Sequence, residues 1–143
     1  MIISCGGVVV NKDGMILVLR KKNGYYCLPK GRVESGETWQ EAALREVKEE
    51  TNIDASIVEF VDEISYVIKG PKGVRQPKVV NWFLMKPTSF EPIPQKSEGF
   101  QKCFYISKDE SQRLLAYDNE RYIVRKAFRL IKRNDEFYTD GQN

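Results

Sequence analysis

The chain of 143 residues contains no histidine. This absence excludes serine-histidine and cysteine-histidine nucleophilic systems, and it excludes any zinc site with histidine ligands. Proton transfer in an active site would instead need a carboxylate, a lysine, a tyrosine or a metal-bound water molecule. Any catalytic site in this sequence must therefore be built from those groups.

Cysteine is scarce, and long apolar runs are missing. The three cysteines, Cys5, Cys27 and Cys103, have neither paired spacing nor an even count. This pattern favours reduced residues in or near the core over a disulfide set or a zinc site. No apolar run is long enough to cross a bilayer, and the N-terminus lacks the layout of a signal peptide. We therefore expect a cytoplasmic protein without a membrane partner.

Neither sign of charge has a large excess, because 23 lysines and arginines face 20 acidic residues for a net charge of +3. This value does not indicate a general nucleic-acid binder, so we expect no DNA partner, but it is compatible with an anionic substrate. The hydrophobic share is 41% and the charged share 30%. Both are ordinary for a globular chain, and the length predicts one domain over residues 1–143.

A segment from Gly31 to Ile53, GRVESGETWQEAALREVKEETNI, places glutamates at helical spacing directly behind a turn. Thr38 and Glu41 have the spacing of a capping box, so the helix should begin near Thr38. Asn52 is a plausible left-handed helix end. Apolar residues recur at the spacing of one buried helix face: Trp39, Ala42, Ala43 and Val47.

Three glutamates lie beside this face, at positions 46, 49 and 50. Residues three and four apart are neighbours on a helix, so Glu46 can share a site with Glu49 and Glu50. Clustered carboxylates repel unless a cation joins them, and hard divalent ions prefer oxygen ligands. The cluster therefore predicts a divalent-metal site suited to phosphate chemistry. The alternative is a solvated acidic helix whose charges are balanced by Arg45 and Lys48.

Other segments alternate between strands and helices. Strands are expected over residues 2–10, 15–20, 25–28, 57–68, 78–86 and 101–106, with the first two forming a hairpin. Ser107 and Glu110 form a second capping box, which opens a short helix ending near Ala116. A last helix is expected over about 119–133, followed by a frayed tail after 134. This order predicts an α/β fold with helices on both sides of a mixed sheet.

The glutamate segment resembles the Nudix box, G-x5-E-x7-R-E-U-x-E-E-x-G-U, in which U is a bulky aliphatic residue. The matching positions are Gly31, Glu37, Arg45, Glu46, Val47, Glu49, Glu50 and Ile53. Asn52 replaces the last glycine, and because asparagine tolerates a positive φ this change should leave the helix end intact. The resemblance implies a single Nudix domain with the box at 31–53 and an α/β/α sandwich with a mixed central sheet.

Nudix enzymes cleave a nucleoside diphosphate linked to another group by water attack on a phosphorus atom. The resemblance implies that Mg²⁺, or Mn²⁺, is held by Glu46, Glu49 and Glu50, one of which could help to deprotonate the water. It implies that Glu37 and Arg45 support the site, with Arg45 orienting a carboxylate. Lys30 would face the polyphosphate.

Three further passages resemble the asymmetric diadenosine tetraphosphate hydrolases: LPKG before the box and the longer segments 69–87 and 97–120. This likeness implies roles for four residues: Glu98 as catalytic base or additional metal ligand, Lys78 as phosphate contact, and Tyr66 and Tyr117 as walls that stack an adenine. Each has a structural alternative as a strand, loop or helix-junction residue. Where those relatives carry histidine, tryptophan and histidine near the box, this chain has Tyr25, Tyr26 and Arg32.

Three functions follow as hypotheses. The first is magnesium-dependent hydrolysis of diadenosine tetraphosphate to ATP and AMP. The second is removal of pyrophosphate from RNA 5′ ends, for which the last helix offers basic residues: Arg121, Arg125, Lys126, Arg129, Lys132 and Arg133. A solvated helix face also explains these charges. The third is a nucleotide-sensing module without catalysis, which the intact glutamates disfavour.

Overall fold

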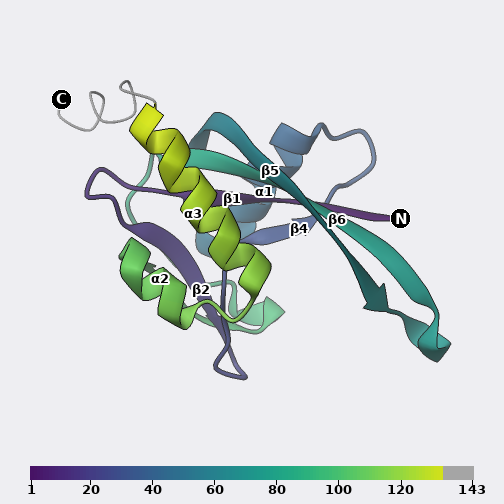
Figure 1. Ribbon diagram of the computed structural model, residues 1–143. Coiled ribbons are helices and arrows are strands. Elements are labelled where there is room, and N and C mark those ends of the chain that lie inside the picture. The colour runs from purple at the N-terminus through teal and green to yellow at the C-terminus, as the bar shows by residue number, and fades with distance from the viewer. Residues whose placement is uncertain (134–143) are drawn as a thin grey trace.

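The computed structural model describes residues 1–133, so the tail expected after residue 134 lies outside the described residues. A mixed sheet stands between helix α1 on one side and helix α3 on the other (Figure 1). The predicted α/β fold with helices on both faces of a mixed sheet is confirmed. Within residues 1–133, no helix is long and apolar enough to span a membrane.

The larger sheet has four strands in the order β4-β1-β6-β5. They are β1 (Ile2–Val9), β4 (Lys30–Arg32), β5 (Ala55–Lys69) and β6 (Arg75–Pro87). β1 runs parallel to β6, whereas β4 and β5 pair antiparallel with their neighbours. β5 and β6 continue as a long two-stranded ribbon that ends in the short 3-10 turn η1 (Pro71–Gly73), at the lower right of Figure 1. The sequence prediction missed β4, the strand that opens the box.

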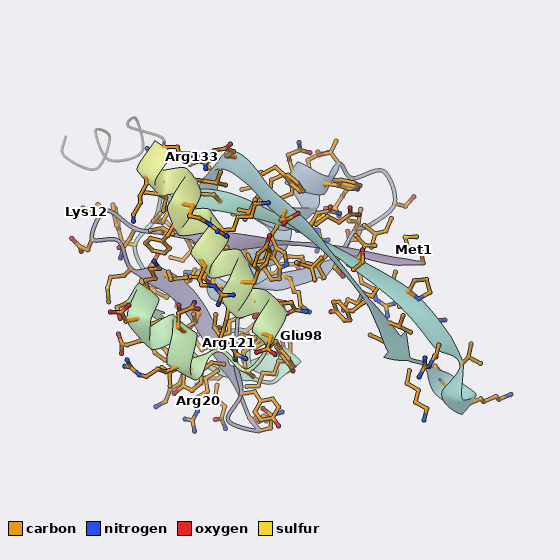
Figure 2. All side chains as sticks on the ribbon, viewed as in Figure 1. Met1, Lys12, Arg20, Glu98, Arg121 and Arg133 are labelled. Carbon is orange, nitrogen blue, oxygen red and sulfur yellow. The ribbon has the colours of Figure 1, made fainter. Side chains whose placement is uncertain are left out.

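The smaller sheet has the order β3-β2-β7 and consists of β2 (Ile16–Lys21), β3 (Tyr26–Cys27) and β7 (Phe100–Ile106). The predicted hairpin of the first two strands is wrong. β1 and β2 share a single bridge, Val10 to Ile16, and then enter different sheets. Both strands are buried along most of their length. β1 pairs with β4 and β6, and β2 pairs with β3 and β7, so neither needs the other as a partner. Met1 and Lys12 mark the two ends of the β1 segment in Figure 2.

Helix α1 (Trp39–Thr51) begins and ends where the sequence predicts. The Thr38 hydroxyl accepts from the Glu41 N–H, and the Glu41 carboxylate accepts from the Thr38 N–H at 2.9 Å. Asn52 ends the helix in the left-handed region with φ of 64°. The predicted burial of Trp39 is wrong: its side chain is 45% exposed because it occupies the first helical position, where the apolar stripe ends.

The core consists of two layers separated by the larger sheet. On the α1 side the helix packs Ala42, Ala43 and Val47, all fully buried, against the sheet. On the other side lie α2 (Lys108–Leu114), with the predicted capping box, and α3 (Asp118–Arg133). A second 3-10 turn, η2 (Lys96–Glu98), precedes β7. In Figure 1 α3 crosses the front of the sheet, and Arg133 marks its far end in Figure 2.

Candidate active site

The glutamates of α1 are brought against strand β4 by an unusually close approach. A Cβ atom added to Gly31 would lie only 2.1 Å from the carboxyl carbon of Glu46. Real Cβ atoms do not come so close, so only glycine leaves room for this carboxyl group. Gly31 is also paired with Cys5 of β1, which fixes its position in the sheet. The box glycine is therefore explained by packing of the strand on the glutamate side chain.

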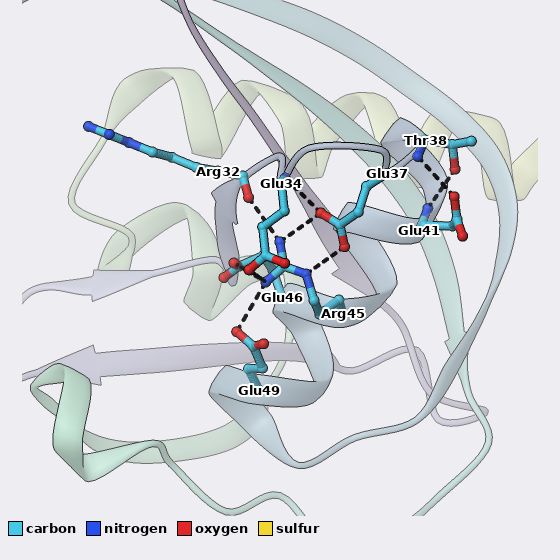
Figure 3. A network of polar contacts seen from close by, with 8 residues as sticks. All are labelled: Arg32, Glu34, Glu37, Thr38, Glu41, Arg45, Glu46 and Glu49. Carbon is cyan, nitrogen blue, oxygen red and sulfur yellow. Dashed lines mark hydrogen bonds and ion pairs between the residues drawn. The ribbon is translucent and has the colours of Figure 1, made fainter.

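Arg45 lies at the centre of a network of carboxylates (Figure 3). Its Nε and Nη2 donate to the two oxygens of Glu37 at 2.6 and 2.9 Å, a bidentate pair. Its Nη1 donates to Glu46 at 2.7 Å and to Glu49 at 3.2 Å, and its Nη2 also donates to the Arg32 carbonyl at 2.9 Å. The hydrogen bonds from Arg45 hold the pKa of Glu37 below its usual value. One guanidinium thus fixes three carboxylates of the box and the end of β4.

Glu46 and Glu50 form the buried part of the cluster. Glu50 is 8% exposed, and its Oε1 accepts from the Lys30 N–H at 3.1 Å. Burial, followed by repulsion from Glu46, raises the pKa of Glu50 to about 8. Burial also raises the pKa of Glu46, despite the attraction of Arg45. The two carboxyl groups lie four residues apart on the same helix, so they are close neighbours.

These carboxyl oxygens are the donors that Mg²⁺ and Mn²⁺ prefer. A cation would offset the repulsion between the Glu46 and Glu50 carboxyl groups, so the chemistry of the donor set fits a hard divalent metal. Within residues 1–133, no three acidic, cysteine or histidine side chains stand in metal-binding geometry. In this structure the positive charge next to Glu46 and Glu49 is the Arg45 guanidinium.

A cavity of about 440 Å³ opens beside Glu50, between the larger and the smaller sheet. Its charged lining comes from Lys21, Lys30, Glu50 and Glu120, and its aromatic lining from Tyr66, Trp82, Phe100 and Tyr117. The structure thus brings together three residues predicted from the sequence, Lys30, Tyr66 and Tyr117, with the glutamate cluster. Their strands and helix are far apart in the chain, and the fold alone places them around one cavity.

Lysines crowd this cavity. Lys78 lies beside it, with its Nζ 5.9 Å from the centre of the Tyr66 ring, and Lys21 lies 5.6 Å from the centre of the Tyr117 ring. Burial, followed by repulsion from Lys30, lowers the pKa of Lys78 to about 8. Like charges held together in a partly buried place favour an anionic ligand. The predicted phosphate contacts, Lys30 and Lys78, are therefore neighbours.

Several residues that line the cavity were not predicted from the sequence as site residues, above all Lys21, Trp82 and Glu120. Lys21 ends β2 and Trp82 lies mid-strand in β6, so neither belongs to a motif. Glu120 lies in the first turn of α3, where an acidic residue is explained by the helix dipole alone. The signal that the sequence offers is weak: Trp82 falls inside the passage 69–87 and Glu120 inside the passage 97–120.

Among residues 1–133, no hydrogen bond or ion pair joins Glu98 to the glutamates of α1. Glu98 is exposed in η2, and its carboxylate has no hydrogen-bond or ion-pair partner in the described part of the chain. The connection to α1 is indirect: the Gln95 N–H donates to the Glu50 carbonyl, and the Glu98 N–H donates to the Gln95 carbonyl. The role expected for Glu98 therefore stays a prediction.

The two tyrosines before the box take part in ring contacts. Tyr25 packs edge-on against Tyr117 with ring centres 6.4 Å apart. Tyr26 packs edge-on against Phe104 at 6.0 Å. Tyr25 therefore supports one wall of the cavity in a position where the diadenosine tetraphosphate hydrolases carry another residue.

Comparison with known proteins places the chain in context. It matches the family described as the NUDIX domain over residues 2–127. It is 31% identical to the putative mutator protein MutT4 of Mycobacterium tuberculosis, over 96% of this chain but 58% of that protein. It is 34% identical to the RNA pyrophosphohydrolase of Erythrobacter litoralis, over 89% of this chain and 90% of that protein. It is 29% identical to the asymmetrical bis(5′-nucleosyl)-tetraphosphatase of Sus scrofa, over 80% of this chain and 79% of that protein.

Among solved structures, a binary complex of the Caenorhabditis elegans Ap4A hydrolase has a similar fold. The TM-score is 0.77 at 24% sequence identity, over 94% of this chain and all of that one. At this identity the likeness shows that the two chains share a fold. The sheet and helices described above are therefore those of an established α/β architecture.

Proposed function

The chain belongs to the Nudix hydrolase family, and from that premise we propose that it is a metal-dependent pyrophosphohydrolase whose substrate is diadenosine tetraphosphate, cleaved to ATP and AMP. One observation carries the choice of substrate. The cavity of about 440 Å³ joins the Glu50 carboxyl to two lysines and two tyrosine walls. A dinucleoside polyphosphate has the matching parts: a scissile bridge, an anionic chain and flat bases.

Glu46, Glu49 and Glu50 would hold the metal, which would neutralise charge on the phosphates and lower the pKa of a bound water molecule. Arg45 would keep Glu46 and Glu49 in place through the bonds that it donates to both. Glu37 would in turn fix the guanidinium through its bidentate contact. One of the α1 carboxyl groups would accept the proton of the attacking water.

The remaining residues of the cavity would bind and orient the substrate. Lys30, Lys78 and Lys21 would contact the polyphosphate, whose charge offsets the repulsion among these lysines. Tyr66 and Tyr117 would stack an adenine, a contact worth about 1–3 kcal/mol per base. The alternative roles of these tyrosines as plain packing residues are disfavoured by their place on one cavity.

A direct test is to incubate the protein with diadenosine tetraphosphate and Mg²⁺ and to identify the products by chromatography. We expect ATP and AMP in equal amounts. Absence of turnover, alongside rapid cleavage of a different nucleotide, would reject this substrate. Glu98→Gln belongs in the same assay, since a large loss of turnover would assign Glu98 a catalytic role and normal turnover would remove it from the site.

Glu50→Gln separates an enzyme from a nucleotide-sensing module. For an enzyme we expect turnover to fall by about a thousandfold, because a carboxylate that supports the metal is lost. Glu59→Gln is the matched control, since Glu59 is an exposed glutamate on β5 away from the cavity lining. Circular dichroism of both variants checks folding. A sensing module would have little turnover to lose, so equal low rates in all three proteins would favour it.

Pyrophosphate removal from RNA 5′ ends is the second candidate, favoured by the similarity to the Erythrobacter RNA pyrophosphohydrolase. The basic face of α3 supports it less than the sequence indicates. Arg121 bonds to Asp118, Arg125 to Gln112 at 2.7 Å, and Lys126 to Asp62 at 2.9 Å. Four exposed cations without an acidic partner among residues 1–133 are left on that helix: Arg125, whose partner Gln112 is neutral, Arg129, Lys132 and Arg133.

The RNA candidate is tested with 5′-triphosphorylated RNA and a variant in which Arg129, Lys132 and Arg133 are changed to glutamine. Release of pyrophosphate that falls in this variant, while hydrolysis of diadenosine tetraphosphate does not, would support RNA as the substrate. Release that is unaffected by the three changes would leave α3 as a solvated helix face.

A further inference from the structure

Glu120 is a buried acid for which the catalytic site has no use. It lies in the first turn of α3, is 2% exposed, and lines the same cavity as Glu50. Its Oε1 accepts from the Leu28 N–H at 2.7 Å, and this is the one hydrogen bond to the carboxyl group among residues 1–133. A buried carboxyl group with unused hydrogen-bonding capacity costs free energy unless a ligand satisfies it.

The charged and titratable groups that face Glu120 come from every element packed around the cavity. They are Lys21 of β2, Cys27 of β3, Lys30 of β4, Lys78 of β6, and Glu50 of α1 in the same cavity. None of the three lysines forms an ion pair with Glu120 in the described part of the chain. Burial raises the pKa of Glu120 to about 7, against the pull of the Leu28 N–H and the lysines. Both protonation states are therefore populated near neutral pH.

The cavity around this carboxyl group is lined by aromatic and apolar side chains, which suits a planar ring. Tyr66 from β5 and Tyr117, the residue before α3, form aromatic sides, while Ile64 and Trp82 add apolar surface. Glu120 lies three residues after Tyr117, and its N–H donates to the Tyr117 carbonyl at 3.1 Å, so the two residues are neighbours on the cavity lining. Lys21, Lys30 and Glu50 line the same cavity.

We propose that Glu120 hydrogen-bonds to the N1 and N6 edge of an adenine held against Tyr66 and Tyr117, and so sets the base preference of the enzyme. The inference rests on the proposed function, because it takes the cavity to hold a nucleotide. A neutral carboxyl group suits this edge: Oε1 accepts from N6–H beside the Leu28 N–H, and the other oxygen donates its proton to N1. An ionised carboxylate has no proton for N1 and instead accepts from the N1–H and N2–H groups of guanine.

The two protonation states of Glu120 therefore favour different purines. Adenine should be preferred while the carboxyl group is neutral, and guanine should gain as it ionises. Other groups that titrate in this range, such as Lys78, contact the phosphates in either substrate. Their effects cancel in the ratio of the two substrates, so the ratio reports on Glu120.

Glu120→Gln provides the test. The glutamine carbonyl still accepts from the Leu28 N–H, and its NH₂ group donates to N1 of adenine at every pH, but it opposes N1–H of guanine. We would measure kcat/KM for diadenosine and diguanosine tetraphosphate between about pH 6 and about pH 8.5, together with equilibrium binding of ATP and GTP. In the unmodified protein the adenine-to-guanine ratio should fall about tenfold as pH rises, whereas in the variant it should become independent of pH.

A merely structural role would not move this ratio, because glutamine preserves the bond to Leu28. Equal ratios at all pH values in both proteins would therefore overturn the proposal. Glu59→Gln, an exposed change, should leave the pH dependence of the ratio as it is. If neither dinucleotide is hydrolysed but the ratio of ATP to GTP binding changes with pH as described, the role of Glu120 in base preference is supported and diadenosine tetraphosphate is rejected as the substrate. If neither mononucleotide binds, the inference about Glu120 is wrong.

Discussion

Around Arg45 every charge has a partner, whereas in the neighbouring cavity like charges gather without ion pairs. The Arg45 guanidinium contacts Glu37, Glu46 and Glu49 at 2.6 to 3.2 Å. Across the cavity, Lys21, Lys30 and Lys78 form no ion pair among residues 1–133, although the buried Glu120 lies nearby. Charges that are already neutralised hold a framework together, and charges that repel indicate where an anionic ligand binds. The difference separates the scaffold of this site from its binding surface.

Among the changes that test this difference between framework and binding surface, the largest effect is expected at the centre of the framework. Arg45→Lys keeps the positive charge but removes the planar guanidinium group with its several N–H donors. A lysine therefore cannot bridge Glu37, Glu46 and Glu49 at once. We expect kcat to fall by about a hundredfold, because misplaced carboxylates support the metal poorly. The measurement is steady-state hydrolysis of diadenosine tetraphosphate. Lys48→Arg on the same helix is the control, and a similar loss of kcat in that variant would contradict a specific role for the Arg45 guanidinium.

Gly31→Ala tests the close approach on which the framework depends. The added methyl group meets the Glu46 carboxyl at 2.1 Å, so strand and helix must separate. We expect a loss of about 1–3 kcal/mol in the free energy of unfolding, with reduced kcat. Urea titration monitored by circular dichroism measures the free energy of unfolding, and the hydrolysis assay measures kcat. Unchanged stability together with unchanged kcat would show that β4 and α1 can move apart freely.

Lys78→Gln tests the binding surface and should change substrate affinity more than the chemical step. We expect KM to rise about tenfold with little change in kcat, because a contact to the phosphate chain is lost. Lys72→Gln, at the exposed tip of the β5-β6 ribbon, is the matched control and should behave as the unmodified protein. A fall in kcat at constant KM would place Lys78 in the framework instead.

The smallest effect concerns pH. The pKa of Lys78 is lowered to about 8, so this lysine loses its charge as pH rises through that value. The protonated form binds phosphate better, hence KM should increase about fivefold between pH 7 and about pH 9. Lys78→Gln should flatten this part of the KM profile. A profile that is equally steep in the variant would assign the titration to another group.

Prediction from the sequence succeeded where the signals are local. Thr38, Glu41 and Asn52 fix the ends of α1 by hydrogen bonds within one or two turns, and the structure has these bonds. It failed where the outcome depends on distant partners. Val10 and Ile16 look like the base of a hairpin, yet the strands diverge because β1 pairs with β6 and β2 with β7. An apolar run in the sequence does not show which other strand will pair with it.

The candidate site shows the same division. The glutamate helix, its caps and its likeness to the Nudix box can be predicted from the sequence, since helical spacing places Glu46, Glu49 and Glu50 together wherever the helix packs. Only the tertiary structure decided that Tyr66, Tyr117 and Lys30 share a cavity and that Glu120 is buried within it. These residues meet through sheet pairing and helix packing between segments far apart in the chain. Burial, which sets the pKa and the chemical role of each acid, is a property of that packing rather than of local sequence.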